Sequence, residues 1–185
     1  MKAIHMTFAT LIVLISSHAL AQSTTAELEL DKADPKDVAS IDALVDAYYS
    51  SLCGEAGDRR AHNRRYASLF AKTAWVVTLT LRTDDGEMIP NARPIADWMT
   101  RYPDVRDNSF YEWEVARRTE QFAHMAQVFS TYENSDKNSD PEPKRHGITS
   151  FELAYIDGRW WIVALQWSGQ PADQPLPERY LSKKD

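Results

Sequence analysis

The chain has 185 residues and a formal net charge of −6, from 21 basic and 27 acidic side chains. This acidic balance argues against a general binder of nucleic acids or of anionic membranes. Hydrophobic residues make up 43% of the sequence, so length and composition suit one domain with a sizeable core. Cys53 is the only cysteine, and we expect a buried thiol because no disulfide can form within the chain.

The N-terminal residues resemble an export signal. The apolar run Phe8–Ile15 is too short to span a bilayer, and Ala19-Leu20-Ala21 is the small-x-small pattern that signal peptidase cleaves. We therefore expect residues 1–21 to be removed and the protein to be periplasmic or secreted, with no membrane contact after cleavage. Residues 22–36 are polar and acidic, which predicts a flexible arm.

The first part of the following domain predicts two helices. Asp37 is the expected N-cap of the first helix. Within it, apolar side chains recur at steps of three and four residues, at Val38, Ile41, Val45, Tyr48 and Leu52. The second helix, over about residues 59–71, places His62, Tyr66, Leu69 and Phe70 along one side.

The rest of the domain, to residue 170, predicts mostly strands, and residues 171–185 form a tail. Strands are expected at 74–81, 110–122, 124–133, 148–155 and 160–167, with a short helix near 94–102 and a polar loop over 133–144. Asp157-Gly158 between the last two strands predicts a type I′ hairpin turn, which requires positive φ. The order of elements predicts an α+β fold, in which N-terminal helices pack on a strongly curved antiparallel sheet and leave a cavity between them.

Several segments resemble the nuclear transport factor 2-like superfamily, and its SnoaL-like branch in particular. They are Tyr66–Ala71 leading into Trp75-Val76-Val77, Ala126–Glu133 followed by Gly147–Ser150, and Asp157–Ile162 with Trp167. The resemblance covers about residues 37–167 and implies a cone-shaped fold that relatives commonly assemble into homodimers. It does not imply one activity, because this superfamily contains isomerases, dehydratases, cyclases, hydrolases and binding modules.

The sequence departs from the catalytic members of the superfamily at one place. In isomerase-like and cyclase-like members, a carboxylate base follows the second helix. Here that segment, Phe70–Trp75, contains Lys72 but no Asp or Glu. A lysine with an ordinary pKa is charged at neutral pH and cannot accept a proton. No catalytic residue is assigned on this basis.

His124 is the single catalytic candidate. It begins an alternating face that continues through Ala126, Val128, Ser130 and Tyr132, a mixture of small apolar and hydroxyl side chains that suits a pocket wall. A histidine there would act as a base or donate a hydrogen bond to a ligand. The alternative is a structural histidine whose nitrogens are satisfied by neighbouring groups.

Tyrosines supply the other ligand-binding candidates. Tyr48 and Tyr66 project from the two helices under the cone, and Tyr132 lies on the face that His124 begins. The resemblance implies that Tyr48 or Tyr49 polarises a substrate oxygen, and the alternative is aromatic packing. The histidines show no metal-ligand spacing, and Asp136-x-Asn138-x-Asp140 lacks the Gly and the final acid of a calcium loop. We expect neither a metal nor another cofactor.

Three functions remain open at this point. The first is binding of a small, partly apolar molecule in the cone cavity. The second is a dehydratase- or isomerase-like enzyme that uses His124 and a tyrosine. The third is a dimeric protein-interaction module that uses the outer face of the sheet.

Overall fold

The computed structural model describes residues 32–81, 88–138, 140 and 142–181, and the predicted signal peptide and most of the predicted arm lie outside these residues. The described part contains three α-helices: α1 (Ile41–Leu52), α2 (Arg60–Ser68) and α3 (Ile95–Met99). Short 3-10 helices lie at each end, η1 (Pro35–Asp37) and η2 (Glu178–Tyr180).

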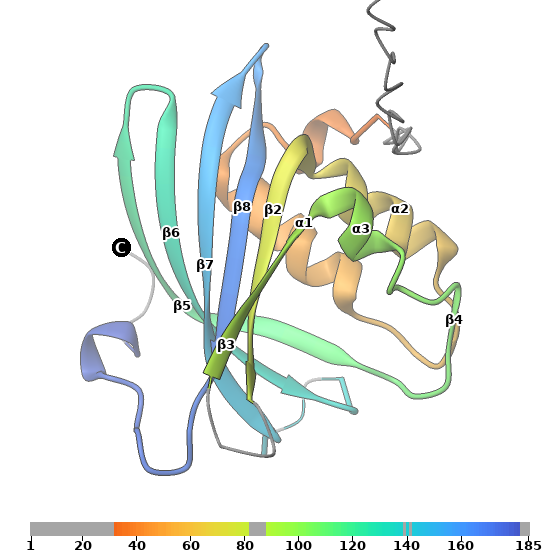
Figure 1. Cartoon of the computed structure of the whole chain (residues 1–185), viewed down its shortest axis with the longest axis vertical. Helices are drawn as coiled ribbons and strands as arrows, with labels where there is room; N and C mark the ends of the chain where they lie inside the picture. The colour runs from red at the N-terminus through yellow and green to blue at the C-terminus, as the bar shows by residue number, and fades with distance from the viewer. Residues whose placement is uncertain (1–31, 82–87, 139, 141, 182–185) are drawn as a thin grey trace, which may run out of the picture.

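The main sheet has six strands, and its order is β3-β2-β8-β7-β6-β5. Their bounds are β2 Phe70–Leu81, β3 Met88–Pro94, β5 Tyr111–Phe122, β6 Met125–Ser135, β7 Arg145–Ile156 and β8 Arg159–Gly169. All neighbours pair antiparallel except β2 and β8, which are parallel. Two short strands, β1 (Gly57–Asp58) and β4 (Val105–Arg106), pair separately. The predicted α+β fold is confirmed, with the helices on one side of the curved sheet (Figure 1).

The core lies between α1, α2 and the sheet face that they cover. Its largest fully buried side chains are Tyr66, Phe70, Phe151, Leu44, Leu69, Ile95, Ile162 and Leu165. On β6 the alternating residues Ala126, Val128, Ser130 and Tyr132 are all buried, as the period of two predicts. This face of β6 therefore points inward.

The closing hairpin has the expected turn. Asp157 and Gly158 both have positive φ, at 52° and 82°, and β7 and β8 pair in register on either side of them. This pair of left-handed residues is what a type I′ turn requires, and its twist matches that of the flanking strands.

The helix boundaries differ from the predicted ones. The N-cap of α1 is Ser40, whose hydroxyl accepts a hydrogen bond from the Ala43 amide at 3.1 Å. Asp37, the predicted N-cap, is instead buried in η1 and forms an ion pair with Arg65 of α2. Part of the predicted arm packs against the domain, because Ala33 is buried in the core.

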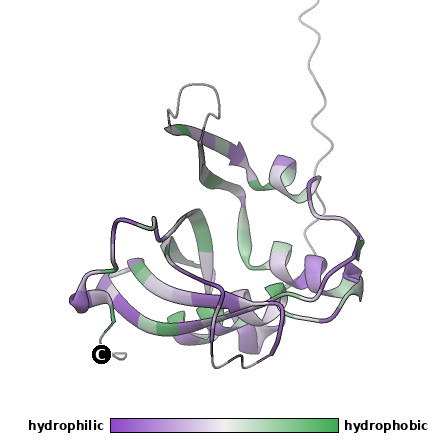
Figure 2. Ribbon diagram, turned by 90° about the horizontal axis from the view of Figure 1, so that it is seen from below, coloured by the Kyte–Doolittle hydropathy of each residue, from purple (hydrophilic) through white to green (hydrophobic). Residues whose placement is uncertain are grey.

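Of the two strands in the β2–β3 hairpin, the sequence predicts β2 but not β3. β3 contains Pro90 and Pro94, and proline argues against a strand because it has no amide donor. An edge strand tolerates it, and β3 is the edge beyond β2. β2 pairs with β8 only at Phe70 and over 75–78, and the outer part of the β2–β3 hairpin stands apart from the other strands (Figure 2).

Candidate functional site

A cavity of about 350 Å³ opens between α1 and the sheet, and we call it the cone cavity. Helix α1 and the segment after α3 form one wall, and the ends of β5, β6, β7 and β8 form the other. The lining residues are Tyr48, Leu52, Tyr102, Phe110, Glu112, Tyr132, Asn134, Arg145, Thr149, Trp167 and Gly169. Aromatic side chains dominate this lining, with a few polar groups among them, which is the composition of small-molecule sites.

Glu112 supplies the acidic group of the cavity. Burial raises the pKa of its carboxyl from 4.5 to about 7, and a hydrogen bond from Asn134 Nδ2 at 3.3 Å only partly opposes this rise. Both protonation states are therefore populated near neutral pH. A carboxyl in this condition can accept a proton from a bound molecule or give one to it.

The backbone of Glu112 is fixed by the end of α1. Its carbonyl accepts a hydrogen bond from Cys53 Sγ at 3.2 Å, and its amide donates to the same sulfur at 3.3 Å. Next to it, Phe110 and Gly54 exchange backbone hydrogen bonds of 2.9 and 3.0 Å. Burial raises the pKa of the Cys53 thiol, so the sulfur stays protonated and serves as a structural donor.

Three tyrosines line the cavity together with Glu112. Burial raises the pKa of Tyr48, Tyr102 and Tyr132, and the negative charge of Glu112 raises each of them further. For Tyr132 the pKa reaches about 12. The three hydroxyls are thus neutral, and they are hydrogen-bond donors on side chains that line the same cavity as Glu112.

Gly147 makes room for Tyr132. The two residues are cross-strand partners on β7 and β6. A methyl group at Gly147 would lie 2.4 Å from the Tyr132 hydroxyl oxygen and 2.5 Å from the carbonyl oxygen of Ser168. The absence of a side chain at Gly147 therefore lets the Tyr132 ring lie across β7 and reach the cavity.

The structure brings two of the four predicted ligand-binding residues to the cavity. Tyr48 and Tyr132 line it, whereas Tyr66 is fully buried beneath it and stacks on Tyr102 with ring centroids 5.2 Å apart. Of the neighbouring pair on α1, Tyr48 faces the cavity, while the Tyr49 hydroxyl lies 2.7 Å from Ser130 Oγ. Binding of a ligand by Tyr48 and Tyr132 stays a prediction.

The prediction for His124 is wrong about its place. The residue is exposed in the turn between β5 and β6. Its ring stacks on that of Tyr155, with the two ring centroids 6.1 Å apart. Strand alternation does not extend to it, because β6 begins at Met125 and Ala123 reverses the chain with a φ of 49°. His124 therefore cannot act in the cone cavity.

Glu112, Asn134 and Arg145 line the cavity but were not among the predicted site residues. Asn134 had a detectable signal, since it follows Tyr132 by two residues on the inward face of β6, but the predicted strand ended at Glu133. Glu112 had no such signal in the sequence. Glu112 and Glu114 lie two residues apart and so on the same face of a strand, and the sequence does not indicate which of them is near an open cavity. Glu114 instead pairs with buried Arg117 under α1.

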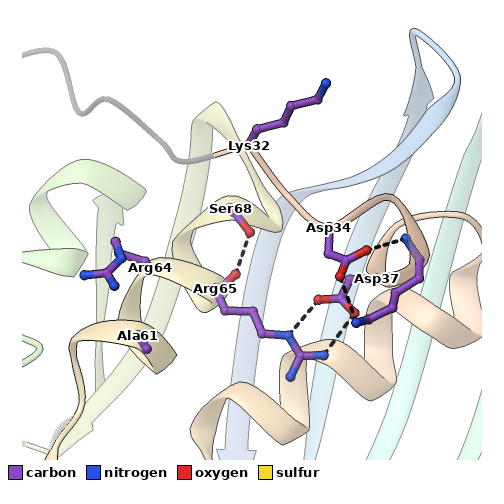
Figure 3. A pocket seen from close by; sticks show the side chains of 8 residues that line it. Lys32, Asp34, Asp37, Ala61, Arg64, Arg65 and Ser68 are labelled. Atoms are coloured by element: carbon purple, nitrogen blue, oxygen red, sulfur yellow. Dashed lines mark hydrogen bonds and ion pairs between the residues drawn. The ribbon is translucent and has the colours of Figure 1, made fainter.

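A second hollow, of about 500 Å³, lies between η1 and α2 (Figure 3). Its charged side chains largely pair with one another. Arg65 Nε lies 2.6 Å from Asp37 Oδ2, and Lys36 Nζ lies 2.8 Å from Asp34 Oδ2. The Arg65–Asp37 pair raises the pKa of the guanidinium and ties η1 to α2, so we assign this hollow a structural role.

The described residues contain no group of three or more His, Cys, Asp or Glu side chains arranged to hold a metal ion. Among them, no helix is both long enough and apolar enough to cross a membrane.

Comparison of the structure with solved structures finds the same architecture. A protein of unknown function with a cystatin-like fold from Nostoc punctiforme superposes with a TM-score of 0.53 at 13% identity, over 74% of this chain and 92% of that one. A protein assigned as the beta subunit of an aromatic-ring-hydroxylating dioxygenase from Novosphingobium aromaticivorans superposes with a TM-score of 0.51 at 11% identity. The match covers 74% of this chain and 88% of that one.

A nuclear transport factor 2-like protein of unknown function from Shewanella baltica gives a TM-score of 0.47 at 14% identity, over 70% and 90% of the two chains. The chain has an α+β fold of the kind that the first of these structures shares, which is described as cystatin-like, and structures described as nuclear transport factor 2-like are among those similar to it. No protein-family model matches the sequence, and no curated protein matches it either. At these identities the likeness establishes the fold alone, so the function must be argued from the cone cavity.

Proposed function

We propose that the protein binds a small, partly apolar molecule in the cone cavity and that Glu112 exchanges a proton with it. The observation that carries this proposal is a carboxyl with a pKa of about 7 among three neutral tyrosines in an open cavity. Aromatic walls would bury the apolar part of the ligand, and Asn134, Thr149 and Arg145 would orient its polar groups.

The arrangement fits a dehydratase- or isomerase-like reaction better than simple storage of a ligand. Such a reaction needs a base within reach of a carbon-bound proton and a donor at the oxygen where negative charge develops. Glu112 supplies the base, and the hydroxyl of Tyr48, Tyr102 or Tyr132 supplies the donor. Glu112 on β5 thus takes the role predicted for His124, and the segment after α2 need not carry a carboxylate.

The test begins with the natural ligand. Native mass spectrometry of the protein purified from its own host should show a bound small molecule, which is then identified. Incubating that molecule with the protein in D2O, followed by NMR, reports whether a carbon-bound proton is exchanged. We expect Glu112→Gln to bind the molecule but to exchange its proton about a hundredfold more slowly, because general-base catalysis contributes at least that much.

Glu120→Gln is the matched control, since Glu120 lies exposed on the same strand. Equal exchange rates for wild type and Glu112→Gln would remove Glu112 from the reaction. Failure to detect a bound molecule in any preparation would contradict the binding proposal itself. These two outcomes are separate, so the binding and the chemistry can fail independently.

We also propose that the protein acts outside the cytoplasm, on the basis of the apolar run Phe8–Ile15 and the Ala19-Leu20-Ala21 pattern. N-terminal sequencing of the protein from its host should then begin at Gln22. A chain that keeps Met1 or begins elsewhere would contradict cleavage after Ala21.

A further inference from the structure

Two arginines converge on the C-terminal end of α1. Arg59, at the start of α2, is only 4% exposed, and Arg106 comes from β4. Arg59 donates to the carbonyl oxygens of Ser51, Leu52 and Cys53 at 2.8 to 3.0 Å. Arg106 donates to those of Leu52, Gly54 and Phe110 at 2.7 to 3.3 Å. Both guanidiniums therefore cap the helix end, where partial negative charge accumulates.

The positive charge here exceeds what the helix end can balance. A helix C-terminus carries about half of one negative charge, against two full positive charges. Within the residues that the structure describes, neither Arg59 nor Arg106 forms an ion pair with a carboxylate. Burial lowers the pKa of both arginines, and the charge of Arg59 lowers that of Arg106 further. The pKa of nearby His62 is lowered by burial and then by Arg59.

A cleft of about 180 Å³ opens beside this pair. Its lining holds a third arginine and no acidic side chain; the residues are Ser51, Leu52, Arg59, Asn63, Arg101, Tyr102, Pro103 and Arg106. The Nε atom of Arg106 is buried and has no hydrogen-bond acceptor in the described part of the chain. A buried N–H without an acceptor is unfavourable, and it adds to the uncompensated positive charge beside the cleft.

We propose that this cleft, lined by Arg59, Arg101 and Arg106, binds a small oxyanion, either a phosphate or a carboxylate. Planar guanidinium groups match the oxygens of such anions, and the volume of the cleft suits a group of this size. Leu52 and Tyr102 line both the cleft and the cone cavity, so the two spaces adjoin. The anion is therefore either a free ion or the charged end of the cavity ligand. This site does not depend on the proton transfer proposed for Glu112.

The buried Arg106 Nε–H provides a direct spectroscopic probe. Its ¹H–¹⁵N signal is followed in the mature protein while inorganic phosphate replaces chloride at constant ionic strength. We expect a saturable shift. Arg101→Gln should weaken phosphate binding about tenfold, because charge-assisted hydrogen bonds contribute about that much. Arg101 is exposed, so its replacement leaves the cap on α1 intact.

Arg60→Gln is the matched control. Arg60 is an exposed arginine at the start of α2 whose guanidinium is held by Asp58, so its loss removes the same charge from the same region. We expect it to leave phosphate affinity nearly unchanged. If Arg101→Gln and Arg60→Gln weaken binding equally, only a diffuse charge effect is present and the site is refuted.

Phenylacetate distinguishes the two sources of the anion. If it shifts the Arg106 Nε–H signal together with the indole N–H signal of Trp167, the anion is the charged end of a molecule that occupies the cone cavity. If phosphate shifts the Arg106 signal and phenylacetate leaves Trp167 unaffected, the site takes a free anion. Either result supports an oxyanion site, and the absence of a saturable Arg106 shift with both probes would overturn it.

Discussion

At the level of single residues, the raised pKa of Glu112 makes the stability of the protein depend on pH. The pKa of this carboxyl is about 7 in the folded protein and near 4.5 in the unfolded chain. Between pH 4.5 and about pH 7, the Glu112 carboxyl keeps its proton in the folded state but loses it in the unfolded chain. The free energy of unfolding therefore falls as the pH rises through this range. The loss is complete above about pH 7 and is on the order of 3 kcal/mol. We expect Glu112→Gln, which stays neutral, to remove this loss.

Urea unfolding at about pH 5 and about pH 8 measures the effect. Glu112→Gln should differ little from wild type at the lower pH and be more stable at the higher one, by up to about 3 kcal/mol. Glu120→Gln, on the exposed end of the same strand, should change stability little at either pH. A Glu112→Gln effect that is the same at both pH values would contradict the raised pKa.

At the level of elements, the pairing of β6, β7 and β8 at the cavity depends on Gly147. A methyl group there would meet Tyr132 on one side and the backbone of Ser168 on the other, so two strands would have to shift. We expect Gly147→Ala to lower the free energy of unfolding by about 1–3 kcal/mol, as overpacking does. It should also displace Tyr132 from the cavity, which NMR of the tyrosine ring would detect.

Gly169→Ala is a close control, because Gly169 is the cross-strand partner of Gly147 on β8. A methyl group at Gly169 would lie 3.9 Å from the Tyr132 hydroxyl and 4.0 Å from the nearest backbone oxygen, which are ordinary contacts. The two substitutions add the same group to neighbouring positions. Equal losses of stability would show that the fit around Tyr132 is not the cause.

The elements also show how far the sequence could predict this fold. Periodicity located α1, β6 and the closing hairpin, because each presents one apolar face or a turn with a definite φ requirement. The sequence pattern gave wrong or missing elements where contacts between distant residues determine the local structure. Asp37 has the chemistry of an N-cap but is held by Arg65 instead, and β3 carries prolines that only its edge position allows.

The candidate site was less predictable for the same reason. The cone cavity collects residues from six separate segments, so no spacing along the chain relates Tyr48 to Glu112 or Arg145. The raised pKa of Glu112 arises from burial, which the sequence does not record. A strand over 124–133 would place His124 on the inward face of β6, but β6 begins at Met125, so His124 lies outside the alternation.

At the level of the whole molecule, the C-terminal tail lies on the opposite side of the sheet from the helices (Figure 1). The rings of Tyr180 and Phe129 pack together with their centroids 5.5 Å apart. The Tyr180 carbonyl accepts a hydrogen bond from Thr131 Oγ1 at 2.6 Å. Arg118 Nε donates to the Arg179 carbonyl at 2.7 Å. The tail thus covers part of the outer sheet face, which is the surface predicted from the sequence for a dimeric module.

Removal of residues 170–185 should therefore strengthen self-association. The truncated chain exposes Phe129 and its neighbours on β6, and burying one such aromatic side chain stabilises a dimer about tenfold or more. Sedimentation equilibrium of the full and truncated chains measures the two dissociation constants. Phe129→Ser in the truncated chain should reverse the gain, because it removes the apolar side chain that Tyr180 covers. If truncation leaves the dissociation constant unchanged, the tail does not compete with a second copy for this face, and any homodimer must form elsewhere.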